Sequence, residues 1–227
     1  MTRLLAIETS GSVCSVAVSV DGALISTVEI LQANVHDEML SKCVHDVVRN
    51  AQLTMEDIDV VAVSAGPGSF TGLRIGVSFA KGLCFTGKPR LLAVPTLTAL
   101  MHAGTEVARI GRSTSITAVV ASHRDLIYVA SSPVEDATHL APVELLPLEE
   151  IRGRISDSTI VVGPAASQLI PSPVSGLTRL SARFVAFSAW KLLDAGAPFN
   201  DALTFVPDYQ QEFKQQTENI DQRTATS

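Results

Sequence analysis

The sequence is most suggestive of chemistry at a glycine-rich turn over residues 66–72, which reads Gly-Pro-Gly-Ser-Phe-Thr-Gly. The turn follows an uncharged, β-branched run at 60–63 and precedes a helical pattern. Such a turn can hold a phosphate, because free backbone N–H groups and the helix dipole favour an anion there. It lacks the lysine of G-x-x-x-x-G-K-[ST] and the spacing of G-x-G-x-x-G. The pattern therefore favours a tight structural turn, with a phosphate site as the alternative.

A second candidate is His36, which stands at the start of another helical pattern. Two histidines four residues apart lie on one helical face and can bind a metal ion together, but the residue four positions after His36 is Leu40. The glutamate of His36-Asp37-Glu38 precedes no second histidine, so the zinc-protease motif is also missing. We therefore predict no metal site and interpret His36 as a helix-start or interface residue.

The candidate nucleophiles are Ser10, Ser69 and Cys84. None of them has an identifiable base at a recognisable motif spacing, so we predict no catalytic residue. The three cysteines, which include Cys14 and Cys43, are far apart in the sequence and odd in number. This argues against a disulfide framework and against a zinc site, and we expect buried thiols.

The hydrophobic pattern of the first half of the chain predicts a mixed sheet covered by helices. Asp21-Gly22 favours a tight hairpin between two of the strands. The predicted elements are strands over 4–8, 13–20 and 23–30, a helix from residue 37, a strand from residue 59, a helix capped by Thr71, a strand over 90–94 and a helix over 95–108.

The second half of the chain begins after a polar stretch at 104–115 that contains two glycines and two arginines, where we place the boundary between two lobes. Residues 1–108 are predicted to form the N-terminal lobe and residues 109–210 the second lobe. Residues 211–227 are polar and are expected to be a disordered tail. Further predicted elements are strands over 116–121, 126–131 and 159–162 and a helix over 182–195.

Composition restricts the possible partners and compartment. Of the 227 residues, 46% are hydrophobic and 18% charged, and the formal net charge is −6 without a basic block. This charge argues against direct binding of nucleic acid. No apolar run reaches the length of about 18 residues that suggests a membrane span. The chain passes from Met1 directly into a strand pattern without a signal-peptide cleavage site, so we expect a cytoplasmic protein that does not contact the membrane.

The run 66–74, followed by Ala80-Lys81-Gly82-Leu83, resembles the TsaB (YeaZ) family. The strand end Glu8-Thr9-Ser10 and the helix entered through His36 support the resemblance, which covers roughly the first hundred residues. It implies an α/β fold of the actin/Hsp70/sugar-kinase (ASKHA) type, with two lobes that each contain a mixed sheet covered by helices. It also implies a non-catalytic subunit that binds a TsaD-like catalytic subunit, with TsaE as a further candidate partner, in the threonylcarbamoyl modification of tRNA adenosine.

The resemblance also makes Glu8, Thr9 and Ser10 candidates for a position beside a nucleotide, since actin-fold ATPases place an acid at the end of the first strand. The TsaB family more often has Asp where this chain has Glu8. The alternative is a strand-end acid that accepts hydrogen bonds from the neighbouring turn. We predict no cofactor for the chain alone, and ATP with magnesium only at an interface shared with the partner.

The helix after Gly72 predicts a surface for that partner. Its apolar residues cover an arc of about 200°, wider than one core-facing side requires, and Gly72, Gly76 and Ala80 form a strip of small residues. The alternative is that this strip packs on the chain's own helix at His36. The predicted partner-binding residues are His36, Leu40, Gly72, Arg74, Ile75, Gly76, Phe79 and Ala80.

Two other functions compete with the scaffold. A small ATPase or sugar kinase of the same fold would turn over nucleotide by itself, whereas a scaffold would not. A self-associating structural protein would remain a homodimer in the presence of TsaD. A homodimer of the isolated chain agrees with the scaffold as well, because an apolar helix face without its partner can pair with its own copy.

Overall fold

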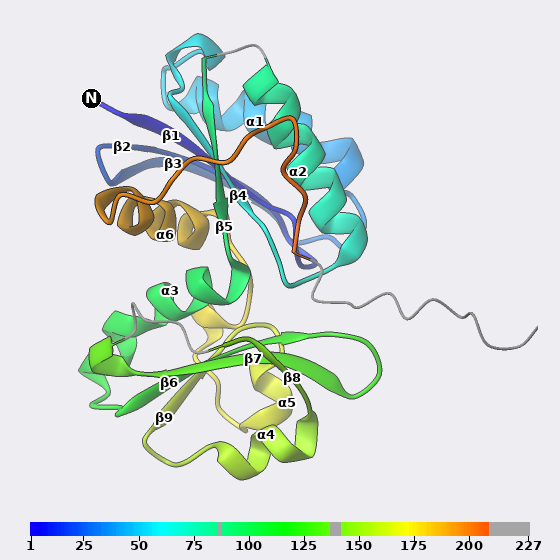
Figure 1. The fold of residues 1–227 in the computed structure, drawn as a ribbon, viewed down its shortest axis with the longest axis vertical. Coiled ribbons are helices and arrows are strands. Elements are labelled where there is room, and N and C mark those ends of the chain that lie inside the picture. Colours follow the sequence, from blue (N-terminus) through cyan, green and yellow to red (C-terminus); the bar gives the residue numbers. More distant parts are fainter. Residues whose placement is uncertain (86–87, 137–141, 209–227) are drawn as a thin grey trace, which may run out of the picture.

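Two mixed β-sheets, one in each lobe, form the frame of the molecule in the computed structural model (Figure 1). The structure describes residues 1–85, 88–136 and 142–208. The first sheet has the strand order β3-β2-β1-β4-β5 and the second has the order β8-β7-β6-β9. The predicted α/β fold, with a mixed sheet covered by helices in each of two lobes, is confirmed. The predicted tail at 211–227 lies outside the described residues.

Helices cover both faces of the first sheet, which explains why its central strands are almost wholly apolar. Along β1, Leu5 and Ile7 face the helices α1 and α2, whereas Leu4 and Ala6 face α6. β1 pairs antiparallel with β2 and parallel with β4. The elements of this layer are β1 (Arg3–Glu8), β2 (Cys14–Val20), β3 (Ala23–Ile30), α1 (His36–Asn50), the short η1 (Met55–Asp57), β4 (Val60–Ser64), α2 (Phe70–Phe85), β5 (Arg90–Val94) and α6 (Ala182–Asp194).

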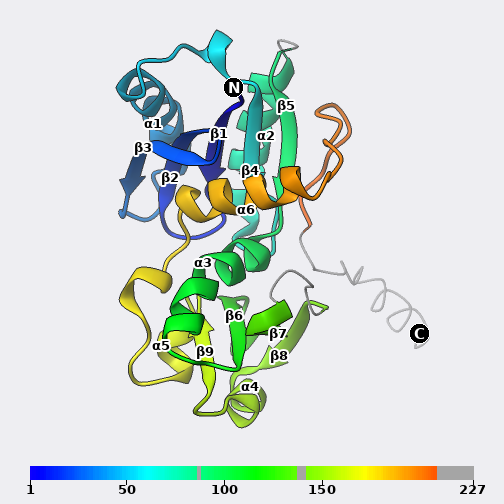
Figure 2. The same ribbon diagram turned by 90° about the vertical axis from the view of Figure 1, so that its left-hand side faces the viewer.

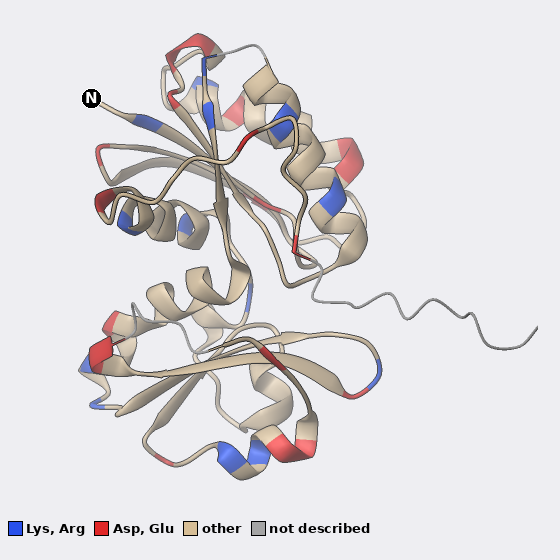
Figure 3. Cartoon of the chain, in the orientation of Figure 1, with Lys and Arg blue, Asp and Glu red and all other residues tan. Residues whose placement is uncertain are grey.

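The second sheet is also covered on both faces. Ile116, Ala118 and Val120 of β6 face α3, whereas Val119 faces α4 and α5. Figure 3 shows acidic and basic residues side by side on α4, where Arg152 pairs with Glu149 at 2.6 Å. The elements are α3 (Thr96–Ile110), β6 (Ser115–Ala121), β7 (Leu126–Pro133), η2 (Val134–Asp136), β8 (Glu144–Pro147), α4 (Leu148–Arg154), β9 (Thr159–Val162), α5 (Ala166–Leu169) and η3 (Ser175–Leu177).

The helices α3 and α6 lie against each other between the two sheets (Figure 2). α3 covers the second sheet, and α6 returns to cover the first. A buried hydrogen bond of 2.9 Å joins His102 Nδ1 on α3 to Ser188 Oγ on α6. Burial and the nearby charge of Lys191 lower the pKa of His102 to about 4, so the imidazole is neutral at pH 7. The lobe boundary near residue 108 stays a prediction, and this packing favours a grouping of α3 with the second lobe.

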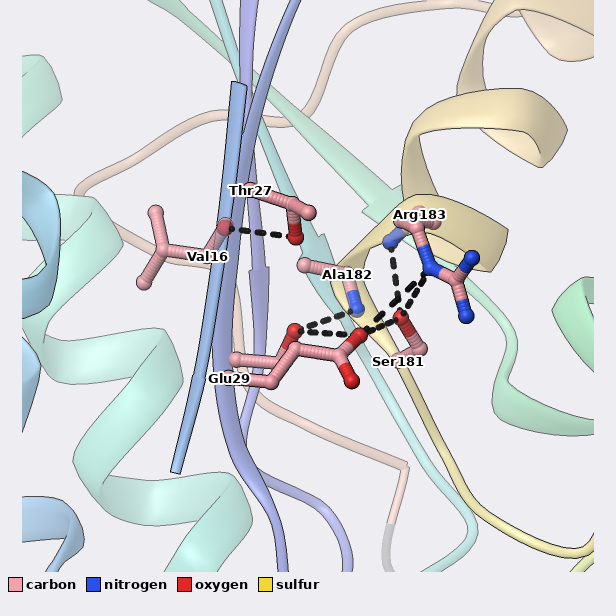
Figure 4. A network of polar contacts seen from close by, with 7 residues as sticks. Val16, Thr27, Glu29, Ser181, Ala182 and Arg183 are labelled. Carbon is pink, nitrogen blue, oxygen red and sulfur yellow. Dashed lines mark hydrogen bonds and ion pairs between the residues drawn. The ribbon is translucent and has the colours of Figure 1, made fainter. Parts of the chain in front are cut away.

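A polar network holds the start of α6 on the first sheet (Figure 4). The carboxylate of Glu29 on β3 accepts a hydrogen bond from Ser181 Oγ and lies 3.5 Å from Arg183 Nε. Ser15 Oγ on β2 accepts the backbone N–H of Ala182 at 3.0 Å. The chain is therefore fixed at the point where it returns from the second sheet to the first.

Among the described residues, no helix has both the length and the apolar composition needed to cross a membrane.

Candidate partner surface and interlobe cavity

A cavity of about 660 Å³ lies where the first strand ends and the two longest helices of the first lobe begin. The ends of β1 and β4 meet at this edge of the first sheet, because the two strands are parallel. The second lobe contributes the end of β6 and three further residues. The lining residues are Ser10, Gly11, Ser12, Ala33, Asn34, His36, Asp37, Ser69, Thr71, Gly72, Ile75, Val120, Ala121, Ser122, Pro164 and Leu180.

The strand end Glu8-Thr9-Ser10 forms hydrogen bonds within the chain. Glu8 is only 1% exposed, and its Oε1 accepts the backbone N–H of Ser10 at 2.5 Å and Ser10 Oγ at 2.6 Å. Thr9 Oγ1 donates to the carbonyl of Gly72 at 2.8 Å. Of the three residues only Ser10 lines the cavity. These contacts agree with a strand-end acid that holds the neighbouring turn, and a position beside a nucleotide stays a prediction.

Burial raises the pKa of the Glu8 carboxyl from 4.5 to about 7. A carboxyl whose pKa is higher in the folded chain stabilises it below the unfolded pKa, and this contribution is lost as the pH rises through the folded pKa. The free energy of unfolding therefore falls as the pH rises from 4.5, and the full loss, reached above pH 7, is about 3 kcal/mol.

We expect the replacement Glu8→Gln to remove this pH dependence, because glutamine keeps an acceptor oxygen for Ser10 but cannot ionise. The difference in unfolding free energy between the variant and the wild type should grow in favour of the variant by about 3 kcal/mol from pH 5 to pH 8. Urea unfolding of both proteins across this range measures the difference. A difference that stays constant with pH would show that Glu8 does not titrate in this window.

The glycine-rich turn is anchored from several sides. The N–H of Ser69 donates to the carbonyl of Ser10 at 2.7 Å. Ser69 Oγ accepts the N–H of Gly72 at 3.2 Å, and α2 begins at Phe70. The expected N-cap at Thr71 is therefore wrong by two positions, because the hydroxyl of Ser69 is the one that reaches the free N–H group. The turn thus fixes the start of α2 against the end of β1.

The strip of small residues on α2 packs against the end of β1. A Cβ atom on Gly72 would lie 2.0 Å from the carbonyl oxygen of Thr9, and one on Gly76 would lie 2.1 Å from Thr9 Oγ1. Ala80 is fully buried. Glycine is therefore required at Gly72 and Gly76, where a side chain would collide with Thr9, directly after β1. Ala80 shares a core cluster with residues of α1 such as Leu40 and Val44.

Three of the eight predicted partner-binding residues reach the surface. Arg74 is exposed, and Ile75 and Phe79 are half-buried. The guanidinium of Arg74 lies over the ring of Phe70, 4.4 Å from its centroid. His36, Leu40, Gly72, Gly76 and Ala80 are buried. These five residues lie below the surface, where they can support it but have little area for direct contact with a partner. Direct partner contact by Arg74, Ile75 and Phe79 stays a prediction.

His36 is 7% exposed, and its Nε2 has no hydrogen-bond partner among the described residues. Within residues 1–85, 88–136 and 142–208, no three His, Cys, Asp or Glu side chains are grouped closely enough to hold a metal ion. The buried position of His36 agrees with its interpretation as a helix-start residue.

Comparison of the sequence with known proteins gives a match to a family and matches to individual relatives. Residues 28–140 match the family described as TsaD, tRNA N6-adenosine threonylcarbamoyltransferase. The tRNA threonylcarbamoyladenosine biosynthesis protein TsaB of Escherichia coli is 36% identical over 95 residues, which are 42% of this chain and 41% of that protein. The protein of the same name from Haemophilus influenzae is 34% identical over 104 residues, 46% of this chain and 44% of that protein. The matched segments thus span less than half of these relatives.

The solved structure of YeaZ from Pseudomonas aeruginosa has the same fold over nearly the whole chain. Its TM-score is 0.73 at 25% sequence identity, and the match covers 92% of this chain and 100% of the other. The similarity in structure therefore extends beyond the matched sequence segments and includes the second lobe.

Proposed function

The chain belongs to the TsaB (YeaZ) family, and on this premise we propose that it is a non-catalytic scaffold for a TsaD-like subunit in the threonylcarbamoyl modification of tRNA adenosine. In this proposal the chain binds its partner through α1 and α2 and acts in the cytoplasm. TsaE is a further candidate partner, and the partner holds the tRNA, because this chain has a formal net charge of −6.

The observation that supports the proposal most is that the polar groups at the end of β1 form hydrogen bonds within the chain. Ser10 donates two hydrogen bonds to the carboxylate of Glu8, and the hydroxyl of Thr9 donates to the carbonyl of Gly72 in the first turn of α2. Side chains that an actin-fold ATPase would direct at a nucleotide are thus engaged in fixing a helix. On that helix Arg74 is exposed, and Ile75 and Phe79 are half-buried and pack in part against the core. Arginine beside apolar side chains is a combination typical of interface centres.

Reconstitution of the modification tests the proposal. The TsaD-like subunit from the same genome is assayed for threonylcarbamoyladenosine formation on tRNA with and without this chain. We expect product formation to depend on the chain, and equal product formation in its absence would contradict the proposal.

Calorimetry of the isolated chain with ATP and magnesium tests the rival enzyme. The scaffold predicts no turnover above background, whereas a small ATPase or sugar kinase predicts hydrolysis or transfer by this chain alone. Turnover that is lost in the Glu8→Gln variant would support the rival.

A further inference from the structure

The segment that follows α6, residues 199–208, runs across the edge of β5 and along α2 (Figure 1, orange). We call it the strap. Its first anchor is Asn200, whose N–H donates to the carbonyl of Leu91 at 2.9 Å and whose side-chain oxygen accepts the N–H of Ala93 at 2.7 Å. Arg90 adds a cation–π contact, 3.6 Å from the ring centroid of Phe199. The strap therefore begins as an extension of the sheet.

The middle of the strap is held by one side chain of α2. Lys81 Nζ donates to the carbonyl of Phe205 at 2.9 Å and to that of Leu203 at 3.2 Å. Asp201 accepts the N–H of Leu203 and the hydroxyl of Thr204, both at 2.9 Å, which bends the strap. Lys81 thus joins α2 directly to two backbone carbonyls of the strap.

The end of the strap lies on the turn that begins α2. The N–H of Asp208 donates to the carbonyl of Ala65 at 2.8 Å. A Cβ atom on Gly66 would lie 2.0 Å from the carbonyl oxygen of Asp208, and the φ of Gly66 is +109°. On its other side, the carbonyl of Gly66 accepts the N–H of Thr96 at 2.8 Å. The strap and α3 thus hold this turn between them.

The strap also forms one wall of a groove on α2. The groove has a volume of about 230 Å³ and contains Arg74, the exposed member of the predicted partner surface. The shape of this groove therefore depends on the position of the strap relative to α2. The lining residues are Arg74, Val77, Ser78, Lys81, Phe205, Val206 and Pro207.

We infer that Lys81 is a positioning residue for partner binding: it holds the strap along α2 and so keeps the turn at residue 66 and the surface around Arg74 in one arrangement. This inference rests on the proposed function, since it concerns the same helix. Lys81 need not touch the partner, because its amine is engaged by two carbonyls of its own chain.

The test uses the full chain with Lys81→Met, which keeps most of the side-chain length but removes the donor. We expect faster amide hydrogen exchange at 201–208 and 66–74 and a melting temperature that falls by no more than a few degrees. Binding to the TsaD-like subunit should weaken by about tenfold, because the partner must then order the strap that the two lost hydrogen bonds no longer hold. Lys81→Arg, which can still donate to both carbonyls, should restore most of the affinity. Lys191→Met removes the same charge from α6 and should bind like the wild type.

The outcomes separate this inference from the proposed function. Equal affinity of Lys81→Met and wild type would overturn the inference, as would unchanged exchange at 66–74. Weaker binding by Lys191→Met to the same extent would also overturn it, because a general loss of charge would then be the cause. If the wild type itself does not bind the TsaD-like subunit, the proposed function fails, and the exchange at 66–74 alone decides whether Lys81 positions the turn.

Discussion

Replacement of Gly76 by leucine is expected to lower the free energy of unfolding by about 3 kcal/mol or more, the upper part of the range for overpacked cores. The first carbon of the new side chain would lie 2.1 Å from Thr9 Oγ1. Thr9 cannot move away easily, because it is 1% exposed and donates its hydroxyl to the carbonyl of Gly72. The gain in helix propensity is under about 1 kcal/mol and does not offset this clash.

Gly82 provides a matched control on the same helix. A Cβ atom there would meet no atom within 4 Å, so Gly82→Leu should gain helix propensity and raise stability by up to about 1 kcal/mol. Urea unfolding of both variants measures the two effects. If Gly76→Leu were as stable as the wild type, the strip of small residues would face open space, and a partner helix could occupy it.

The second large effect concerns binding. Arg74→Glu is expected to weaken the complex with the TsaD-like subunit by about a hundredfold, because reversal of a charge at an interface costs on the order of 3 kcal/mol. The side chain is exposed, and its guanidinium forms no ion pair with another described residue. The fold loses only the contact with Phe70, worth about 0.5–1 kcal/mol at an exposed site. The melting temperature should therefore change little.

Arg109→Glu is the matched control for this charge reversal. Arg109 lies on α3 and pairs with Glu106 at 2.6 Å on an exposed helix surface. Its replacement changes the net charge by the same amount away from α2, and we expect wild-type affinity. Titration calorimetry measures the affinity of both variants for the TsaD-like subunit. Equal affinities for Arg74→Glu and wild type would exclude Arg74 from the interface.

The strands and long helices of the first lobe could be predicted from the sequence because each has a complete local signal. Asp21-Gly22 marks the hairpin between β2 and β3, and Asp21 and Gly22 both adopt positive φ there. The apolar run of β4 is buried throughout, as expected for a strand covered on both faces. The short elements β8, α4 and α5, with four, seven and four residues, were not predicted. β9 has only four residues as well, but its β-branched run at 159–162 marks a strand. β8, α4 and α5 have neither such a run nor enough residues to show a period.

The site was harder to predict because hydrophobic periodicity shows that a residue is covered but not what covers it. On α2 the wide apolar arc was interpreted as a partner surface, yet Gly72 and Gly76 pack on Thr9. No local pattern shows that α3 covers the second sheet or that α6 returns to cover the first. The position of the strap has no local signal either, because its contact with Lys81 joins residues more than 120 positions apart.

The mass of the species formed when this chain is mixed with the TsaD-like subunit tests the central claim most directly. Native mass spectrometry at micromolar concentration should show a complex that contains both chains, and any homodimer of this chain should disappear as the partner is added. Two proteins that remain separate, or a homodimer that persists in excess partner, would contradict the scaffold function.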